Sequence, residues 1–506
     1  MAIATAALAC APAVPAITAT WTLVPPWTGV GPAPTATSTG TPTLSPLLRL
    51  FPPTHRPDQP ALTPTPDPTR LAPPLRTESV VYAVRPGDSL NTIAQRYAVG
   101  ARLIIAANNL TNPNLLYIGQ VLLIPPPVPQ PPGPSFKIIA DSELVNGPSG
   151  ALLDVEGFAR QWGGYLSSYT EEVEGRVLTG PQVLQTVAQR YSVNPRLLLA
   201  LLEHQSGWVT QADVLSDTLI YPMGFVGVGY EGLFGQLSWA ADELNAGYYR
   251  WRASWAGPFI LSDGTAVPAG PGINAGTAAI QHLFSQLVPA ESWRAVVDEG
   301  GFYQTYLRLF GNPFDVAIEP LVPPDLEQPP LQLPFEPGST WSFTSGPHAG
   351  WGSGSAWAAL DFAPPGDALG CVQSEEWVVA VADGLVLRAD MGEVIQDLDG
   401  DGVEQTGWVI LYMHIESRDR VLPGTMLHAG DRIGHPSCEG GVSSGTHVHI
   451  SRRYNGEWIP ADTNLPFNMD GWISAGGGVE YDGTLSRNGI VLQACACRND
   501  ENQISR

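Results

Sequence analysis

Five side chains that lie far apart in the sequence are of the types that bind a catalytic metal ion and work beside it. Two of them, His447 and His449, stand two residues apart in THVHIS, a run with strand character. Because side chains alternate between the two faces of a strand, both imidazoles are expected on one face, about 7 Å apart along the backbone. Both can reach one metal ion, although paired histidines on a strand are often only solvated.

The other three candidates lie upstream of this pair. The run TSGPHAGWGSGSAWAALDFAPP places His348 and Asp361 thirteen residues apart across a glycine-rich loop, and YMHI contributes His414. Two imidazoles and one carboxylate are a ligand set of catalytic zinc sites, which leave a fourth position for water. Calcium prefers more oxygen ligands, and copper or iron favours other donors or geometry, so zinc is the expected ion.

The order of these motifs is G-x-H, A-L-D-F, Y-x-H and G-T-H-x-H. It resembles the β-lytic and staphylolysin branch of the lysostaphin-like (LytM) zinc endopeptidases. The resemblance runs from about residue 338 to 495 and includes VVAVADGLV and AGDRIGHPSCEGG. It implies a mostly antiparallel β metallopeptidase domain over 338–506, in which zinc is bound by His348, Asp361 and His449.

The same resemblance implies catalytic roles for His414 and His447 beside the zinc ligands. Imidazoles titrate near neutrality, so these two are expected to take the proton of the hydrolytic water and to stabilise the developing oxyanion. Tyr481, in VEYDG, either adds a hydrogen bond to that oxyanion or is a core tyrosine. His428 and His435 match no position of the pattern and are expected in surface or loop positions.

An acidic run, DLDGDG, precedes the YMHI strand. Asp397, Asp399 and Asp401 take the first, third and fifth positions of a calcium-loop pattern, with glycine at the sixth. The twelfth position is Trp408, where a bidentate glutamate belongs, although Glu404 could contribute an oxygen. The run is therefore either a calcium-stapled insertion or a solvated acidic turn.

Five cysteines fit an oxidising compartment with few disulfides. Cys371 and Cys438 fall in loops of the metallopeptidase-like region and could form a disulfide around the site. Cys495 and Cys497 are expected to be too close to pair comfortably with each other.

Residues 80–126 carry a separate pattern of a short strand, two helical runs and a closing strand. The motifs YAVRPGDSL, IAQRY, ANNL and GQVLLIP resemble the LysM domain, which implies a βααβ fold that binds the N-acetylglucosamine of peptidoglycan or chitin. The implied sugar contacts lie in two loops: Gly87, Asp88, Ser89, Leu90, Asn112 and Leu115. The alternative for Asp88 and Asn112 is that they only cap turns.

Residues 136–325 are predicted to be mostly helical, with helical runs over 180–191, 194–204, 230–255 and 275–287. VNPRLLLALLEHQSGW and the later GLFGQLSWAADELNAGYY resemble lysozyme-like lytic transglycosylases, whose general acid is the glutamate of a Glu-Ser-Gly helix end. Gln205 holds that position here, and an amide cannot deliver a proton. The resemblance implies a non-catalytic lysozyme-like domain that holds glycan, unless Glu203 substitutes; a plain helical spacer is the alternative.

Length and composition indicate a modular chain. At about 150 residues per domain, 506 residues suggest roughly three domains. The Pro- and Thr-rich residues 1–79 and the Pro-rich residues 127–135 and 326–337 are predicted to be linkers. A hydrophobic fraction of 44% excludes a wholly disordered chain.

The net charge and the hydropathy of the sequence limit the kinds of partner that can be expected. The net charge of −23 would repel nucleic acid, which is not expected as a partner. No apolar run is long and unbroken enough to predict a transmembrane helix. MAIATAALACAPA resembles the apolar end of a secretion signal, and a lipoprotein-like box would place a lipid anchor on Cys10; an Ala-rich end without a signal is the alternative.

These features together predict a secreted or envelope-associated, multidomain peptidoglycan hydrolase. A LysM module would target a zinc endopeptidase that cuts stem or cross-bridge peptides. The first rival is an inactive protein that binds the cell wall or regulates other hydrolases, and the presence of all five site residues argues against it. The second rival is a transglycosylase that uses Glu203.

Overall fold

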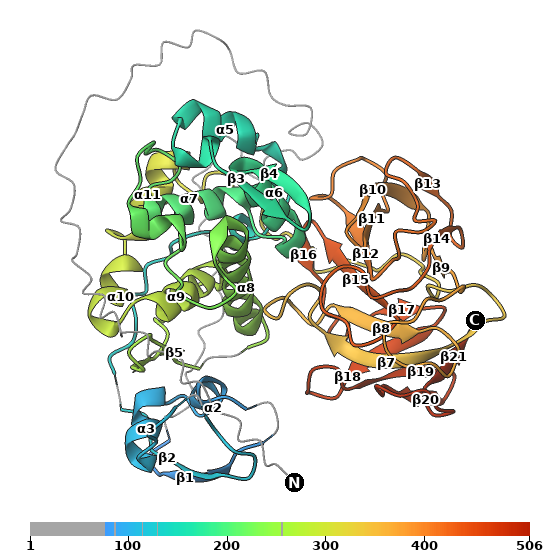
Figure 1. Cartoon of the computed structure of the whole chain (residues 1–506), viewed down its shortest axis with the longest axis horizontal. Helices are drawn as coiled ribbons and strands as arrows, with labels where there is room; N and C mark the ends of the chain where they lie inside the picture. Colours follow the sequence, from blue (N-terminus) through green and yellow to red (C-terminus); the bar gives the residue numbers. More distant parts are fainter. Residues whose placement is uncertain (1–75, 86–87, 114, 129, 255–256) are drawn as a thin grey trace, which may run out of the picture. The chain divides into compact units, whose positions relative to one another are not determined.

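The computed structural model describes residues 76–85, 88–113, 115–128, 130–254 and 257–506 (Figure 1). Three predicted features lie outside the described residues: the secretion signal with Cys10, the tether up to residue 75, and Gly87. No helix within the described ranges is both long and apolar enough to cross a membrane.

The LysM-like segment has the predicted βααβ order. Its elements are β1 Val80–Ala83, α2 Leu90–Arg96, α3 Ala101–Asn108 and β2 Val121–Ile124. β1 and β2 pair antiparallel, and Ile93, Ile104 and Leu122 are fully buried between the sheet and the helices. Ser89 precedes α2, and its hydroxyl accepts the backbone N–H of Thr92 at 3.1 Å, as an N-cap does.

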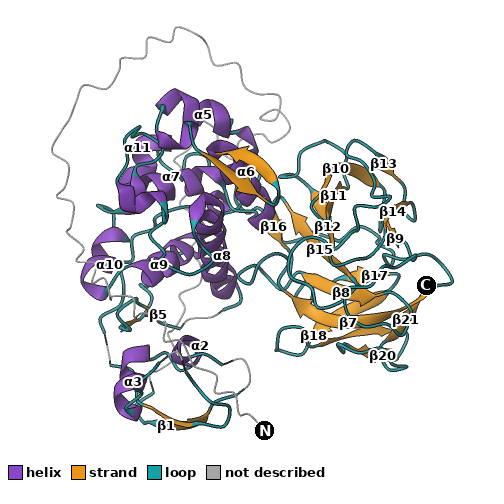
Figure 2. Ribbon diagram, viewed as in Figure 1, coloured by secondary structure: helices purple, strands orange, loops and turns teal. Residues whose placement is uncertain are grey.

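Residues 136–325 are mainly helical (Figure 2). The helices are α4 Asp141–Leu144, α5 Val155–Trp162, α6 Gly180–Tyr191, α7 Pro195–Ser206, α8 Gly232–Arg252, α9 Ala275–Leu287, α10 Ala290–Val296 and α11 Phe302–Phe310. Two hairpins accompany them, β3 Thr170–Val173 with β4 Arg176–Thr179 and β5 Phe259–Ile260 with β6 Ala266–Val267. The four predicted helical runs are confirmed as α6 to α9. α7 is buried from Leu197 to Leu202, because this part of the helix is apolar on all sides.

The chain beyond residue 338 folds mainly as β-sheet. The nine-stranded sheet has the order β13-β10-β11-β12-β15-β8-β7-β21, with β16 also pairing with β15. Its strands are β7 Thr340–His348, β8 Ala359–Ala363, β10 Gly384–Asp390, β11 Glu393–Asp397, β12 Trp408–Met413, β13 Met426–Leu427, β15 Val448–Tyr454, β16 Glu457–Trp458 and β21 Gln503–Ser505. Every pairing in this sheet is antiparallel, as predicted.

Two smaller sheets complete this part of the chain. One pairs β9 Val378–Val379 with β14 Arg432–Gly434. The other has four strands, β17 Asn468–Met469, β18 Trp472–Gly476, β19 Gly483–Arg487 and β20 Ile490–Gln493. Both are antiparallel.

The two faces of the main sheet are buried in different cores. Ile410 and Tyr412 of β12 belong to the core of the β part. Val409 and Leu411, which point to the opposite face, pack in one core with the helices of residues 136–325. This packing lies within one compact unit of the chain, so the helical part stabilises the sheet directly.

The segment predicted as a linker over 326–337 packs into the β part. Leu331, Leu333 and Phe335 are buried, and the backbone N–H of Gln332 donates to the carbonyl of Val381 at 2.9 Å. Their spacing of two is that of a strand-like segment with one apolar face. The Pro-rich segment therefore contributes side chains to the core of the β part.

Charged residues form a connected group within the sheet, and one pair of this group joins the sheet to the helical part. Arg190 of α6 lies 2.7 Å from Glu393 of β11, and Arg388 of β10 lies 2.9 Å from Glu404. Glu404 also bonds to Arg453. Burial alone would raise the pKa of Glu404, but Arg388 and Arg453 lower it to about 2. Each buried charge in this group thus has an opposite partner, which its burial requires.

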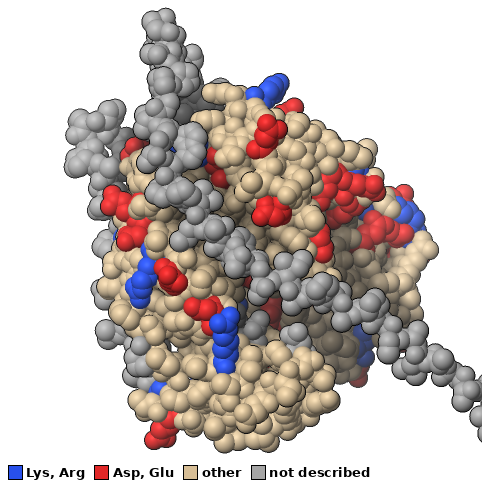
Figure 3. All heavy atoms as spheres, turned by 60° about the vertical axis from the view of Figure 1, so that its left-hand side comes forward, with Lys and Arg blue, Asp and Glu red and all other residues tan. Residues whose placement is uncertain are grey.

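The sequence has 48 acidic and 25 basic side chains. On the face shown in Figure 3, acidic side chains gather in the upper part, and basic side chains are few and scattered. Among the described residues drawn on that face, the basic side chains form no continuous area.

Candidate metal centre

Three side chains predicted as metal ligands converge at three neighbouring strands. His348 ends β7, Asp361 lies in β8 and His449 lies in β15. His348 Nε2 is 3.0 Å from His449 Nδ1, and these nitrogens are 3.2 and 3.3 Å from Asp361 Oδ1. All three residues are buried. In a tetrahedral zinc site with bonds of about 2.0–2.1 Å, ligand atoms lie about 3.3 Å apart, so this spacing fits one ion.

The strand register explains why these residues meet. Asp361 and His449 are direct partners across β8 and β15, and directly opposed residues share a face. The register of β7 against β8 shifts between Ser345 and His348. An irregularity of this kind re-aims a side chain, and here it brings His348 to the face of Asp361 and His449.

The hydrogen bonds of the two imidazoles decide which nitrogens face the centre. His348 Nδ1 is 2.8 Å from the carbonyl of Gly346, and His449 Nε2 is 3.1 Å from the carbonyl of Gly350. A carbonyl only accepts, so each of these nitrogens carries a proton and donates it. In the neutral ring, the other nitrogen then carries a lone pair, and this lone pair points toward Asp361.

Lone pairs on His348 Nε2, His449 Nδ1 and Asp361 Oδ1 therefore face one another in a buried site. Asp361 Oδ1 is buried and has no hydrogen-bond partner among the described residues. Buried carboxylate and imidazole lone pairs about 3 Å apart repel one another unless a cation lies between them. The donor set of His348, Asp361 and His449 thus fits a metal ion by its chemistry as well as by its spacing.

The pKa shifts of the three groups also indicate a site that favours a cation. Burial alone would raise the pKa of Asp361, but His348 and His447 hold it well below its ordinary value. Burial alone would lower the pKa of His348, but the Asp361 carboxylate raises it above its ordinary value. Burial lowers the pKa of His449. A proton on His348 is therefore the cation that competes with a metal for this site.

His414 and His447 lie beside these three residues. Their ring centroids are 4.4 Å apart, and His447 Nε2 is 3.7 Å from Asp361 Oδ2. His414 Nδ1 is 3.0 Å from the carbonyl of Glu439, and His447 Nδ1 is 2.7 Å from the carbonyl of Gly445. Each ring thus donates through Nδ1, and in the neutral form its Nε2 can accept a proton. Burial, His447 and His449 together lower the pKa of His414 to about 3, so it is neutral at pH 7.

Tyr481 lies next to His348. The two rings are stacked with centroids 4.7 Å apart, and Tyr481 is 55% exposed. Its backbone has a positive φ of 70° and is held by hydrogen bonds with Gly346 and Pro347 at 2.8 and 3.1 Å. Tyr481 therefore lies beside the candidate site, and its exposure does not fit a core tyrosine.

The remaining two histidines of this part differ from each other. His428 is exposed, as predicted. His435 lies in a loop position, which the prediction allowed, but it is buried instead of at the surface. His435 follows β14, its Nδ1 is 2.8 Å from the carbonyl of Glu376, and its ring lies 3.9 Å from that of Trp377. The sequence did not predict the burial of His435, because its packing against Trp377 depends on the fold.

The acidic run forms a hydrogen-bonded turn. Oxygens of Asp397, Asp399 and Asp401 come within 4.8 Å of one another. Asp397 accepts the backbone N–H groups of Asp399, Gly400 and Gly402 at 3.0–3.2 Å. Burial and the neighbouring Asp397 raise the pKa of Asp399 to about 6. The suggestion that Glu404 contributes an oxygen is wrong, because this carboxylate bonds to Arg388 and Arg453.

Two disulfides form between cysteines that the structure describes. Cys371 and Cys438 are bonded, with their Cα atoms 5.7 Å apart. Cys495 and Cys497 are also bonded, which corrects the expectation that they would not pair. Their Cα atoms are 5.0 Å apart, within the range of ordinary disulfides, because the chain turns sharply between them. The Asn502 side chain holds this turn by donating to both cysteine carbonyls, at 3.2 and 2.8 Å.

The predicted sugar contacts of the LysM-like segment differ in their exposure. Asp88 accepts the Tyr82 hydroxyl at 2.5 Å and the backbone N–H of Arg85 at 2.8 Å, so its side chain holds the loop together. Leu90 is buried in the core, whereas Leu115 is 50% exposed. The carbonyl of Asn112 accepts the N–H of Leu115 at 3.2 Å, as in a turn, and Ser89 caps α2.

The candidate glycosidic acid of the helical part, Glu203, makes structural contacts, and so does Gln205 beside it. Glu203 is buried and accepts from Thr210 Oγ1 at 2.7 Å and from Arg308 at 2.8 Å. Gln205 donates through its side-chain amide to the carbonyl of Met223 at 2.8 Å. Glu203 thus has a structural role in joining α7 to α11.

Comparison with known proteins identifies domains in the first two parts. Residues 82–125 match the family model of the LysM domain, as predicted. Residues 137–324 match the family model "LasA, N-terminal domain". The resemblance of this helical part to lysozyme-like enzymes stays a prediction.

The chain is homologous to metalloendopeptidases. It is 27% identical to Protease LasA of Pseudomonas aeruginosa (strain UCBPP-PA14) over 291 residues, which are 53% of this chain and 65% of that protein. The beta-lytic metalloendopeptidase of Achromobacter lyticus is 28% identical over 165 residues, 31% of this chain and 41% of that protein. This chain thus spans less than two thirds of the length of either relative.

A comparison of structures finds the M23 metalloprotease pseudoalterin. It is 24% identical to this chain, with a TM-score of 0.28. The match covers 33% of this chain and 96% of pseudoalterin.

Proposed function

We propose that this chain, a homologue of Protease LasA and of beta-lytic metalloendopeptidases, is a zinc-dependent endopeptidase that cuts stem or cross-bridge peptides of peptidoglycan. One observation carries the proposal: His348 Nε2, His449 Nδ1 and Asp361 Oδ1 face one another at 3.0–3.3 Å in a buried site. Only a cation makes that arrangement favourable.

The ligands suit zinc better than other common ions. Two imidazoles and one carboxylate are a catalytic zinc set, whereas calcium and magnesium favour oxygen ligands. A bound zinc ion would supply a Lewis acid and lower the pKa of water to about 7. The carbonyls of Gly346 and Gly350 would keep both imidazoles in the ligating tautomer, because they accept the protons of the opposite nitrogens.

His414 and His447 are proposed as the proton-transfer residues. Each donates through Nδ1 to a backbone carbonyl, which leaves the Nε2 lone pair to accept a proton. His447 is proposed to accept the proton of the attacking water first, because the lowered pKa of His414 makes it a weak base. Once protonated, the same Nε2 becomes a donor that can stabilise the oxyanion or protonate the leaving amine. Tyr481, stacked on His348, is proposed to add a donor at the edge of the site.

The domains outside the peptidase part would place the enzyme on its substrate. The LysM match supports binding to the N-acetylglucosamine of peptidoglycan. A module attached to the wall raises the local concentration of the peptidase without new contacts to the peptide. Two disulfides support an extracellular or envelope location. A calcium ion at Asp397, a lipid anchor at Cys10 and the proposed domain limits of 80–126, 136–325 and 338–506 stay predictions.

Products of peptidoglycan digestion test the function directly. The purified protein is incubated with insoluble peptidoglycan, and the soluble fragments are identified by mass spectrometry. New amino termini that disappear in His449→Ala support the peptidase. Anhydro-sugars would instead indicate a transglycosylase, and binding without products would indicate an inactive wall-binding protein; either outcome contradicts the proposal.

A further inference from the structure

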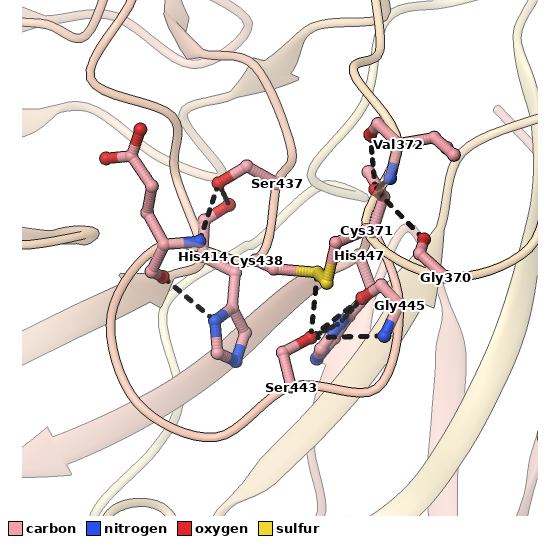
Figure 4. Close-up of a disulfide and its surroundings, with 11 residues drawn as sticks. Gly370, Cys371, Val372, His414, Ser437, Cys438, Ser443, Gly445 and His447 are labelled. Atoms are coloured by element: carbon pink, nitrogen blue, oxygen red, sulfur yellow. Dashed lines mark hydrogen bonds between the residues drawn. A yellow bond between two sulfur atoms is a disulfide. The ribbon is translucent and has the colours of Figure 1, made fainter.

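We infer that the Cys371–Cys438 disulfide sets the position of His414 against His447, so that its two cysteines and Ser443 are positioning residues for proton transfer (Figure 4). The inference rests on the proposed function for its catalytic consequence. The arrangement itself is a property of two loops that the disulfide joins across 67 residues of sequence.

One half of the disulfide holds His414. Cys438 lies between Ser437 and Glu439, and both neighbours bond to this histidine. The backbone N–H of Ser437 donates to the carbonyl of His414 at 2.7 Å, and the Ser437 hydroxyl donates to the same carbonyl at 3.0 Å. The carbonyl of Glu439 accepts from His414 Nδ1 at 3.0 Å.

His414 needs this support because of its backbone. Its φ is +65°, in the left-handed region that residues other than glycine seldom adopt. Such a conformation persists only where the surroundings hold it. Here the residues on both sides of Cys438 hold His414, through its carbonyl and through its ring.

The other half of the disulfide holds the residue before His447. Cys371 lies between Gly370 and Val372, and both bond to Thr446. The carbonyl of Gly370 accepts the backbone N–H of Thr446 at 3.0 Å, and the N–H of Val372 donates to Thr446 Oγ1 at 2.9 Å. Because Thr446 directly precedes His447, these bonds hold the backbone next to this histidine, just before β15 begins at Val448.

Ser443 connects the disulfide with the ring of His447. Its hydroxyl donates to the carbonyl of Gly445 at 2.8 Å, and that carbonyl also accepts from His447 Nδ1 at 2.7 Å. Ser443 Oγ lies 3.4 Å both from Cys438 Sγ and from His447 Nδ1. Figure 4 shows the hydroxyl beside the sulfur atoms and the imidazole.

The metal ligands are positioned by other contacts. His348, Asp361 and His449 lie on the paired strands β7, β8 and β15, and Gly346 and Gly350 orient the two imidazoles. Loss of the disulfide should therefore move the proton-transfer histidines and leave the ligand set intact. This separation distinguishes a positioning role from general destabilisation.

The test compares removal of each disulfide. The double variant Cys371→Ser/Cys438→Ser is measured beside Cys495→Ser/Cys497→Ser, which removes a disulfide of the same chain that makes no contact with either histidine among the described residues. The measurements are bound zinc per chain, kcat and KM on a soluble cross-bridge peptide, and the imidazole N–H signals of 15N-histidine-labelled protein. Ser443→Ala keeps the disulfide and removes only the hydroxyl.

We expect Cys371→Ser/Cys438→Ser to keep its zinc and its KM, while kcat falls at least about tenfold, because a displaced base loses much of its effect. The Nδ1–H signals of His414 and His447 should broaden or vanish in this variant alone. Ser443→Ala should affect the His447 signal and lower kcat by a smaller factor. Cys495→Ser/Cys497→Ser should match the unmodified protein in every measurement.

The inference is overturned if folded, zinc-loaded Cys371→Ser/Cys438→Ser keeps the kcat and both imidazole signals of the unmodified protein. If that variant does not fold, mild reduction of folded Cys495→Ser/Cys497→Ser opens Cys371–Cys438, and unchanged imidazole signals would overturn it equally. If the unmodified protein cleaves no peptide, the proposed function fails, whereas the imidazole signals still decide whether the disulfide positions the two histidines.

Discussion

His449 lies directly opposite Asp361 in the register of β15 and β8, and His449 Nδ1 is 3.3 Å from Asp361 Oδ1. This pair joins the strand order of the sheet to the chemistry of the site. Residues opposed across antiparallel strands lie close together on one face, so the hydrogen bonds of the sheet hold two of the three ligand atoms in place. His348 completes the set from the next strand.

Removal of one ligand should abolish zinc binding. Loss of a residue that only orients a ligand typically lowers metal affinity about 10- to 100-fold. His449→Ala removes a ligand itself, so zinc affinity is expected to fall by much more, and activity should fall with it. Metal content and titration with zinc measure the effect. His428→Ala, at an exposed histidine, is the control and should bind zinc as before. Equal zinc content in both variants would contradict the assignment.

Loss of a proton-transfer residue should leave the metal in place. His414→Ala and His447→Ala are each expected to bind one zinc ion and to lose about 10²- to 10⁴-fold in kcat, the usual contribution of general acid–base catalysis. Zinc analysis and steady-state kinetics on one soluble peptide separate the two effects. A variant that loses its zinc would show that the missing histidine is a ligand instead.

Stability should depend on pH in opposite ways with and without zinc. The Asp361 carboxylate raises the pKa of His348 in the folded, metal-free protein. A raised pKa stabilises the fold below the unfolded value of about 6.5, and this stabilisation is lost as pH rises through the folded value. Zinc binds the deprotonated imidazole. The increase in Tm caused by zinc should therefore grow as pH rises from 6 to 8, and thermal unfolding at several pH values would measure it.

The buried charges between α6 and the sheet should matter for folding more than exposed charges do. Glu393→Gln leaves Arg190 and Arg388 each with one buried partner fewer, and a cost of about 3 kcal/mol in the free energy of unfolding is expected. Glu375→Gln breaks a solvent-screened pair with Arg418 and should change the free energy of unfolding far less. Denaturant unfolding compares the two, and similar costs would contradict the role assigned to Glu393.

The LysM segment should affect activity only on intact wall. A chain that begins at residue 127 is expected to cleave a soluble peptide at the unmodified rate and to act at least about tenfold more slowly on insoluble peptidoglycan, because it lacks tethering. Release of soluble fragments and peptide kinetics measure the two rates. Equal activity of both chains on the wall would exclude targeting by this segment.

Local patterns in the sequence predicted much of this architecture. The runs over 180–191 and 275–287 predicted α6 and α9, because amphipathic spacing and capping act within a few residues. Antiparallel strands and a Cys371–Cys438 pair were also predicted. The set of three ligand candidates and two neighbouring histidines could be selected by residue type and motif order alone.

Only the tertiary structure decided how those residues meet. The shift in register that aims His348 depends on the pairing of β7 with β8. The burial of His435 under Trp377 and the pairing of Glu404 with two arginines involve residues from separate strands and loops. Such contacts depend on strand register and on which sheet face is covered, and neither is determined within a short window of sequence. The amino-acid sequence therefore determined which groups could hold a metal, and the fold decided which atoms face it.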